Sequence, residues 1–346
     1  MTPKILIIRM SSIGDILLTT PLIRILKNRF PDGRIDFVVK KQYQDLIRYH
    51  PSLSRIYTYD ARNEKETLKN LRAHIREERY DIIADIHKNF RSLYLCRCAH
   101  AKQIVRFRKH AWKRWLLVKT KVNLYRDIEP VHQRYIQSLG SYGLKDDGQG
   151  LDITIPDDVT ERVSRLWESR SDGSLNPVIG IAPGASYFTK RWTTEGFAEV
   201  IVKIRERFNA RVILFGDSRD QSVTRELTAS CGSEHLYDFA GELSLLETAA
   251  MMNKCELVLT NDSGLMHLAT ALKKKVVAIF GSTTEELGFY PVSGHALVIQ
   301  NSEVPCRPCS HVGRHRCPKK HFDCMRQISP DQVMGGINRL MADTVT

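Results

Sequence analysis

Three short polar segments of this 346-residue chain combine residue types that can bind an anionic ligand. The first, at 11–15 (SSIGD), places a glycine and an aspartate at the expected start of a helix. The second, at 183–192 (PGASYFTKRW), is a turn of small residues followed by Lys190, and the third, at 261–267 (NDSGLMH), opens another helix and ends in His267. Helix N-termini and backbone N–H groups hold anions, so the three segments together predict a site for a phosphorylated ligand.

Each segment also has a purely structural interpretation. Asp15 is well placed to cap a helix, and Asp262 or Ser263 would cap the helix that follows them. Lys190 would then be a solvated loop residue and His267 an ordinary surface histidine. Taken one at a time, the segments do not distinguish a binding site from a set of helix caps.

Apolar runs that alternate with amphipathic helical patterns must position these segments, as in a parallel sheet whose strands are joined by helices. The alternation is interrupted by glycine and polar residues at 139–150 and then starts again. We therefore expect two α/β lobes, each binding ligands beyond the carboxyl ends of its strands. The expected strands are 4–9, 35–39, 56–59, 81–86, 104–107, 178–182, 211–215, 257–260 and 275–280. One expected helix ends near 28, and two others span 64–79 and 245–252. Three more are expected to begin at 193, 264 and 329.

Composition limits the partners and the location. Fifty-two Lys and Arg against 39 Asp and Glu give a net charge of +13, so the chain meets something acidic: nucleic acid, anionic lipid or phosphorylated sugar. No apolar run reaches the ~18 residues of a membrane span. The N-terminus shows no basic leader followed by an apolar stretch and a cleavage site, so we expect a cytoplasmic protein.

The charge is concentrated in a stretch between 97 and 126, where Trp112 and Trp115 stand among the cations. Such a basic amphipathic surface suits phosphorylated sugars and anionic headgroups, with the apolar side chains at the interface. A solvated charged face is the alternative. The cations are Lys102, Arg106, Arg108, Lys109, Lys113, Arg114, Lys119 and Lys121.

Five colinear segments resemble the ADP-heptose:lipopolysaccharide heptosyltransferase family, glycosyltransferase family 9, over nearly the whole chain. Each segment is a weak signal by itself, whereas the five in this order are specific. They are SSIGDILLTTPLIRILK at 11–27, DIHKNFRS at 85–92, PGASYFTKRW at 183–192, NDSGLMHLATAL at 261–272 and AIFGST at 278–283.

The resemblance implies the GT-B fold, an α/β architecture of two Rossmann-like parallel-sheet lobes facing a central cleft. The first lobe, 1–155, would bind the acceptor, and the second, 156–328, the nucleotide sugar. A C-terminal helix, 329–346, would pack back toward the first lobe. Where family members usually have proline after the Lys-x-Trp element, this chain has Thr193, which affects helix capping.

The resemblance also implies an inverting transfer of heptose from ADP-heptose to the lipopolysaccharide inner core, with no cofactor required for catalysis. Asp15 matches the proposed general base. With no metal to neutralise the departing diphosphate, a lysine and helix N-termini would have to do so. The residues implied for donor binding are Ser186, Lys190, Asp220, Asp262, Ser263, Gly264 and His267.

On the acceptor side we expect an anionic lipopolysaccharide core or lipid A acceptor, no nucleic acid, and peripheral association with the inner face of the inner membrane. The candidate acceptor-binding residues are Asn89, Arg91, Arg106, Arg108, Lys109, Lys113 and Arg114.

Four cysteines near the C-terminus have the density of a structural zinc knuckle, with three histidines among them. They are Cys306, Cys309, Cys317 and Cys324. Packed thiols or a local disulfide are the alternatives. Similar clusters occur in heptosyltransferases of the second type, which favours the branch that adds the second heptose.

Three rival functions differ in what they require. An NAD-dependent oxidoreductase needs G-x-G-x-x-G after the first strand, and the turn at 11–15 lacks it. An RNA-binding protein would explain the charge, but no RNP, KH or helix-turn-helix signature is present. A related transferase with a different nucleotide sugar or acceptor stays open, because base and sugar contacts vary in loops.

Overall fold

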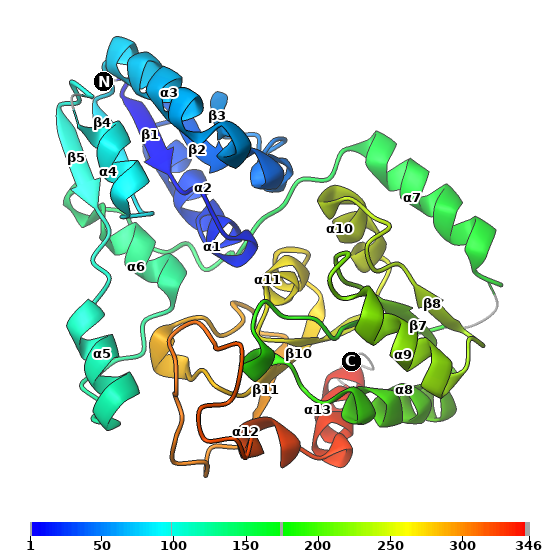
Figure 1. The fold of residues 1–346 in the computed structure, drawn as a ribbon. Helices are drawn as coiled ribbons and strands as arrows, with labels where there is room; N and C mark the ends of the chain where they lie inside the picture. The colour runs from blue at the N-terminus through cyan, green and yellow to red at the C-terminus, as the bar shows by residue number, and fades with distance from the viewer. Residues whose placement is uncertain (1, 98, 174–175, 343–346) are drawn as a thin grey trace. The chain divides into compact units, whose positions relative to one another are not determined.

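The computed structural model describes residues 2–97, 99–173 and 176–342, and the chain divides into two compact units (Figure 1). The first unit contains Met1–Lys109 and Glu129–Thr154, and the second contains His110–Ile128 and Ile155–Thr346. The segment His110–Ile128, which the sequence placed in the first lobe, is therefore part of the second unit. Residues 1, 98, 174–175 and 343–346 of the predicted lobes lie outside the described residues.

The first unit is built on a parallel five-stranded sheet of order β3-β2-β1-β4-β5. The chain moves outward from β1 through β2 to β3 and then returns to β4 on the other side of β1. The strand order therefore reverses between β1 and β4, where ligands bind in open sheets of this kind. The strands are β1 (Lys4–Ile8), β2 (Arg34–Lys40), β3 (Arg55–Tyr59), β4 (Ile82–Asp85) and β5 (Gln103–Arg106).

Both faces of this sheet are buried. Leu6 and Ile8 point into a cluster formed with side chains of α3 and α4. Ile5 and Ile7 alternate with them and are also fully buried, so they point to the opposite face. A central strand covered on both sides explains why KILII is an unbroken apolar run. The helices of this unit are α1 (Ile13–Leu17), α2 (Thr20–Arg29), α3 (Glu64–Glu78), α4 (Phe90–Cys96) and α6 (Val131–Gln137), with 3-10 turns η1 (Lys41–Leu46), η2 (Ala61–Asn63) and η3 (Gly140–Tyr142).

The second unit repeats this plan with a parallel six-stranded sheet of order β11-β10-β9-β6-β7-β8. Its order reverses between β6 and β9. Its strands are β6 (Val178–Ala182), β7 (Arg211–Leu214), β8 (Leu236–Asp238), β9 (Leu257–Asn261), β10 (Lys275–Phe280) and β11 (Ala296–Gln300). Its helices are α5 (Ala111–Thr120), α7 (Asp157–Arg170), α8 (Thr194–Phe208), α9 (Gln221–Cys231), α10 (Leu245–Asn253), α11 (Gly264–Ala271), α12 (Asp323–Arg326) and α13 (Pro330–Ala342), with 3-10 turns η4 (Phe188–Lys190) and η5 (Glu285–Leu287).

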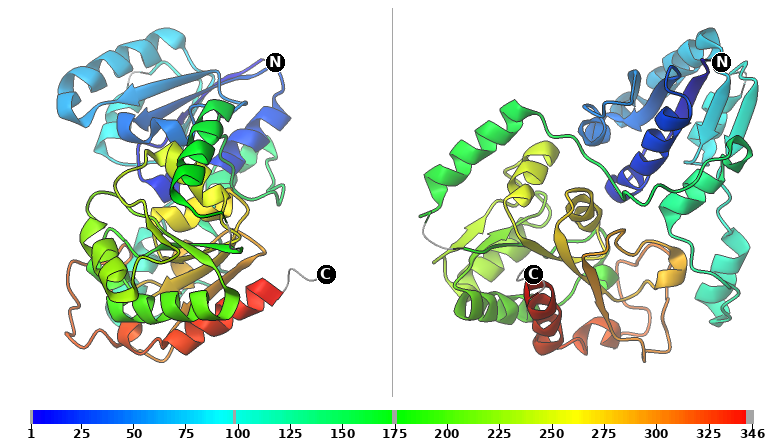
Figure 2. Two further views of the ribbon diagram at one scale, coloured as in Figure 1. Left: turned by 90° about the vertical axis from the view of Figure 1, so that its right-hand side faces the viewer. Right: turned by 180° about the vertical axis from the view of Figure 1, so that it is seen from behind.

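Helices α8 and α13 run side by side beneath this sheet (Figure 2). The expected stripe of α8 is buried, and so are Val333, Ile337 and Leu340 of α13. Within its unit, α13 contacts α8, β9, β10 and β11. The packing of this helix toward the first lobe stays a prediction.

All nine strands expected from the sequence are present, and both sheets are the predicted parallel α/β type. The two strands that the sequence did not reveal, β8 and β11, are at the edges of the second sheet. β8 has three residues, and every residue of β11 is only partly buried. Neither strand therefore has a strong hydrophobic pattern. In the part of the chain that the structure describes, no helix has the length and apolar character needed to cross a membrane.

Candidate active site

The polar cluster of the first unit lies where its strand order reverses. Arg9 follows β1 directly, and Asp15 occupies the third position of α1. One guanidinium nitrogen of Arg9, Nη2, lies 2.5 Å from Asp15 Oδ1. The other, Nη1, donates to the carbonyl of Ile86, just beyond β4, at 2.9 Å. Arg9 therefore joins the ends of the two strands between which the order changes.

Asp15 is both a helix-capping residue and a charged group of the site. Its Oδ2 accepts hydrogen bonds from the backbone N–H and the hydroxyl of Ser12 at 3.2 and 3.0 Å. The Tyr135 hydroxyl donates to Oδ1 at 3.3 Å. Burial opposes ionisation of this carboxyl, but the Arg9 guanidinium and the Ser12 hydrogen bonds outweigh burial and hold its pKa below the usual value. Asp15 is thus a carboxylate at neutral pH.

Three residues of this cluster, Arg9, His87 and Tyr135, were not among the predicted site residues. The buried Arg9 side chain also lies against the ring of Tyr135, 5.6 Å from its centroid. His87, just beyond β4, has its pKa lowered to about 4, chiefly by burial and then by the positive charges of Arg9 and Lys109. It is therefore neutral at pH 7. A cation directly after a buried first strand was the available signal for Arg9, and His87 lies inside one of the segments that resemble the family.

The candidate acceptor residues of the first unit are mostly held by neighbours. Asn89 caps α4 by accepting from the Ser92 N–H at 2.9 Å. Arg91 forms a two-fold ion pair with Glu64 at 2.8 and 3.0 Å. Arg106 Nε donates to the fully buried Asp85 at 2.8 Å, and Lys109 Nζ donates to the Lys88 carbonyl at 2.9 Å. Arg108 follows β5 and is exposed.

The remaining two acceptor candidates, Lys113 and Arg114, lie on α5, which belongs to the second unit. Two contacts anchor the residues after this helix within its unit. Lys121 Nζ donates to the Pro308 carbonyl at 2.6 Å, and Asn123 donates to Glu286 at 3.0 Å. The sequence-predicted acceptor set is therefore divided between the two units.

The polar cluster of the second unit lies at its own reversal point, between β6 and β9. Lys190, at the end of η4, places its Nζ 2.7 Å from Oδ2 of the buried Asp262. The Thr283 hydroxyl donates to the same oxygen at 2.6 Å. Asn261 connects the two loops, because its side chain accepts from the Trp192 N–H at 3.0 Å and donates to the Pro183 carbonyl at 2.7 Å. The second and third motif segments therefore meet.

The other candidate donor residues come from α11, from the loop after β7 and from the turn after β6. Ser263 is the N-cap of α11, Gly264 is its first residue, and His267 is buried within the helix. Asp220 comes from the loop after β7, and burial raises the pKa of its carboxyl. A Cβ on Gly184 would lie 2.4 Å from that carboxylate, so any larger residue there would displace the Asp220 side chain. Ser186 is exposed in the same turn.

Thr193 replaces the proline that the family usually has, and it caps α8 by accepting from the Gly196 N–H at 3.1 Å. Thr193 therefore supplies a side-chain cap at the start of α8, as expected for a change that affects helix capping.

The C-terminal cysteines do not support the predicted structural zinc site. Among residues 2–97, 99–173 and 176–342, no group of three or more His, Cys, Asp or Glu side chains is arranged to hold a metal ion. Cys324 is buried in the hydrophobic core, and Cys306 and Cys317 pack against it. Burial raises the pKa of the Cys324 thiol to about 12 and also raises that of Cys309. Protonated thiols packed in an apolar environment fit the alternative of free thiols, and the described cysteines are indeed unbridged.

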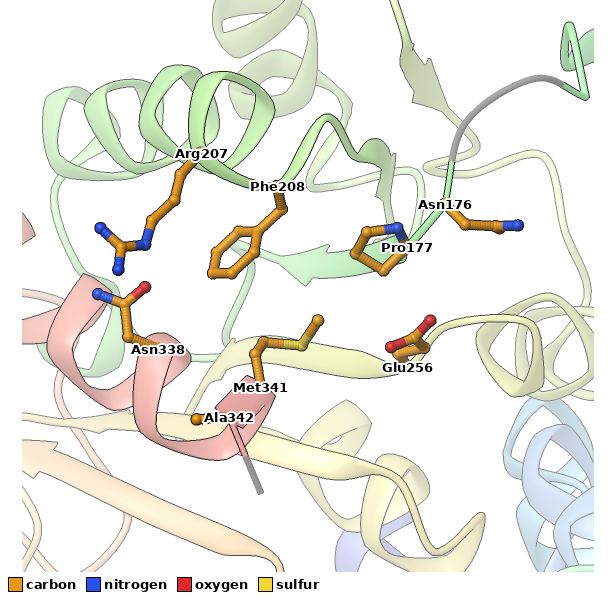
Figure 3. Close-up of a pocket in the computed structure, with 8 residues that line it drawn as sticks. All are labelled: Asn176, Pro177, Arg207, Phe208, Glu256, Asn338, Met341 and Ala342. Atoms are coloured by element: carbon orange, nitrogen blue, oxygen red, sulfur yellow. The ribbon is translucent and has the colours of Figure 1, made fainter. Parts of the chain in front are cut away.

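A cavity of about 470 Å³ lies beside α8 and α13 (Figure 3). Pro177 and Glu256 in its lining come directly before β6 and β9, so the cavity is at the amino ends of these strands. Lys190 and Asp262 are at the opposite, carboxyl edge. This cavity is consequently separate from the candidate active site.

Two parallel α/β units, each with its polar cluster at the point where its strand order reverses, have the architecture of the GT-B class of glycosyltransferases. The family model of glycosyltransferase family 9 (heptosyltransferase) matches residues 68–319, and the chain belongs to this family. The oxidoreductase and RNA-binding alternatives are set aside by this membership.

Similar proteins match the chain over almost its entire length. The chain is 29% identical over 358 residues to lipopolysaccharide heptosyltransferase 2 of Salmonella typhimurium, covering 98% of this chain and 99% of that protein. It resembles a solved glycosyltransferase of family 9 from Veillonella parvula with a TM-score of 0.81 and 22% identity, covering 99% and 97% of the two chains. It resembles the ADP-heptose heptosyltransferase II of E. coli with a TM-score of 0.76 and 24% identity, covering 99% and 100%.

Proposed function

We propose that this chain transfers heptose from ADP-heptose to the lipopolysaccharide inner core, with inversion at the anomeric carbon, and that it adds the second heptose. Relatives named lipopolysaccharide heptosyltransferase 2 align with almost the entire chain. The observation that carries the proposal is the Lys190–Asp262 pair at the reversal point of the second sheet. There an ammonium and the N-terminus of α11 are available to one anionic ligand.

The donor side of the proposal concerns charge on the leaving group. When the bond between the anomeric carbon and ADP breaks, its electron pair remains on an oxygen of the β-phosphate. Lys190 and the N–H groups in the first turn of α11 would stabilise that charge. Asp262 and Thr283 would hold the ammonium in place until the diphosphate is bound. We propose that no metal ion is needed for this step.

The acceptor side depends on Asp15 as the general base. The acceptor hydroxyl attacks the anomeric carbon from the face opposite ADP, and its proton passes to the Asp15 carboxylate. Arg9 keeps this carboxyl ionised at neutral pH, as its lowered pKa indicates. The ion pair with Arg9 also makes the Asp15 carboxylate a weaker base. Its advantage over water as a proton acceptor therefore comes from its position as well as from its proton affinity.

We also propose that α5 contacts the anionic surface in which the acceptor is embedded, at the inner face of the inner membrane. Trp112 and Trp115 are 62% and 60% exposed, although tryptophan is usually largely buried. They are three residues apart on a helix that also carries Lys113 and Arg114. Exposed tryptophans beside cations are typical of a helix lying in a headgroup interface.

The test is product analysis with purified protein, a panel of nucleotide sugars and truncated core acceptors, each with and without EDTA. We expect heptosylated core only with ADP-heptose, with an inverted anomeric centre, and undiminished by EDTA. Transfer from a different nucleotide sugar would favour the related-transferase alternative. Absence of transfer from ADP-heptose to every core acceptor would refute the heptose assignment, and loss of activity in EDTA would refute metal independence.

A further inference from the structure

The cysteine-rich segment, residues 301–325, contacts the loop that carries Lys190 and the loop after β10, whose Thr283 donates a hydrogen bond to Asp262. We propose that this segment is the scaffold that positions the pair, acting through Thr189 on the lysine side and through Arg307 and Thr283 on the aspartate side. The inference rests on the proposed function, because it takes the pair to bind the donor diphosphate. The proposal gives a structural role to residues 301–325, which hold no supported metal site and contribute no residue to the proposed chemistry.

On the lysine side, the contact is a reciprocal pair of hydrogen bonds next to Lys190 itself. The Thr189 N–H donates to the Arg314 carbonyl at 3.1 Å, and the Arg314 N–H donates to the Thr189 hydroxyl at 2.8 Å. The Thr189 carbonyl accepts from the Ser282 N–H at 3.3 Å. Thr189 is 1% exposed, so water does not compete for these bonds. The backbone that bears Lys190 is therefore held from two directions.

Close packing accompanies these bonds. Gly313 has a φ of +110°, and a Cβ built on it would lie 2.6 Å from Cβ of Tyr187. The rings of Phe188 and Phe322 stack with their centroids 4.6 Å apart. The segment and the η4 loop therefore approach each other closely enough to require glycine at the contact.

On the aspartate side, the contact is the half-buried guanidinium of Arg307. It donates to the backbone carbonyls of Gly281, Thr283 and Asn301 at 2.5, 2.9 and 2.5 Å. Because Thr283 donates its hydroxyl to Asp262 at 2.6 Å, fixing the Thr283 backbone fixes the orientation of that carboxylate.

A single segment thus restrains both partners of one ion pair. Small displacements of a group that stabilises a transition state are costly, and an error of about 1 Å lowers rates by about 10²-fold. Thr189 and Arg307 do not have to touch the donor for their loss to reduce activity. They are positioning residues, and their effect should depend on the presence of Lys190.

The experiment compares Thr189→Val with Thr189→Ser, alone and in a Lys190→Met background. Valine keeps the shape but removes the hydroxyl that accepts from Arg314, whereas serine keeps the hydroxyl. We expect Thr189→Val to lower kcat/KM for ADP-heptose and to weaken ADP binding, each by at least about tenfold, and Thr189→Ser to stay within about threefold of the wild type. In the Lys190→Met background, valine should cause almost no further loss, because the group it positions is gone.

Equal activity of the wild type and Thr189→Val, or a full additional loss in the Lys190→Met background, would overturn the proposal. If Thr189→Val fails to fold, Thr283→Val against Thr283→Ser repeats the comparison on the aspartate side, with the same expected tenfold loss and the same refuting result. Failure of the wild type to bind ADP or to transfer heptose would instead refute the proposed function. The two failures are therefore distinguishable.

Discussion

Replacing Asp15 with asparagine separates its catalytic role from its role as a helix cap. Asparagine keeps the size of the side chain, and its amide oxygen can still accept from Ser12 or Tyr135. It cannot take a proton from the acceptor hydroxyl. Loss of a general base lowers kcat by about 10²- to 10⁴-fold, which corresponds to about 3 to 5 kcal/mol in the activation barrier.

The same substitution removes the ionic partner of Arg9. The two side chains are 10% and 19% exposed, so the pair is nearly but not fully buried. We expect the free energy of unfolding to fall by about 1 to 3 kcal/mol, somewhat less than the loss for a fully buried pair. The pKa of Asp15 is lowered in the folded state, so the contribution of the pair is complete above the unfolded-state value of about 3.9. It is lost as the pH falls through the folded-state pKa, and assays near pH 7 measure it in full.

Three measurements are needed: ADP release under saturating acceptor for kcat, calorimetric titration for ADP affinity, and thermal unfolding for stability. ADP affinity should change by less than about threefold, because the ligand groups proposed for ADP are Lys190 and the residues around it. Ser12→Ala is the matched control, since it weakens the cap but leaves the carboxylate and Arg9 in place. It should lose less than about tenfold in kcat. Normal turnover by Asp15→Asn would show that Asp15 is a helix cap only.

Three further variants have defined outcomes. Arg9→Met removes the charge that lowers the pKa of Asp15, while burial still raises it, so the acid limb of the kcat/KM profile should move to higher pH. An unchanged profile would contradict the assigned cause. Lys190→Met should lower kcat/KM by about 10²- to 10³-fold and weaken ADP binding, as measured by steady-state kinetics and calorimetry, and activity within a factor of three would exclude a role at the diphosphate. Replacing both Trp112 and Trp115 with serine should weaken sedimentation with vesicles of anionic phospholipid by at least about tenfold without changing ADP affinity, and unaltered sedimentation would remove α5 from the proposed interface.

The strands and motif segments were predictable because local patterns encode them. Runs such as KILII can be buried on both faces only in a central strand, and the turns after such strands mark the ligand-binding edge. Thr193 was recognisable as a helix start for the same local reason, whereas the sequence left Asp262 and Ser263 as alternative caps and the structure places Ser263 at the N-cap. The edge strands β8 and β11 were not predicted, because an edge strand buries less apolar surface and its hydrophobic pattern is weaker.

By itself, the sequence determined the fold class, the family and the segments that bear Asp15, Lys190 and Asp262, because each depends on residue order and local periodicity. Only the tertiary structure decided their partners. Arg9 meets Ile86, and Thr283 meets Asp262, across separations that no local pattern records. In the tertiary structure, cysteines of the C-terminal cluster pack in or against the hydrophobic core of the second unit. The basic helix α5 is also part of this unit. Such contacts form when distant strands bring their carboxyl ends to one sheet edge, and the register of those strands is set by burial over the entire sheet.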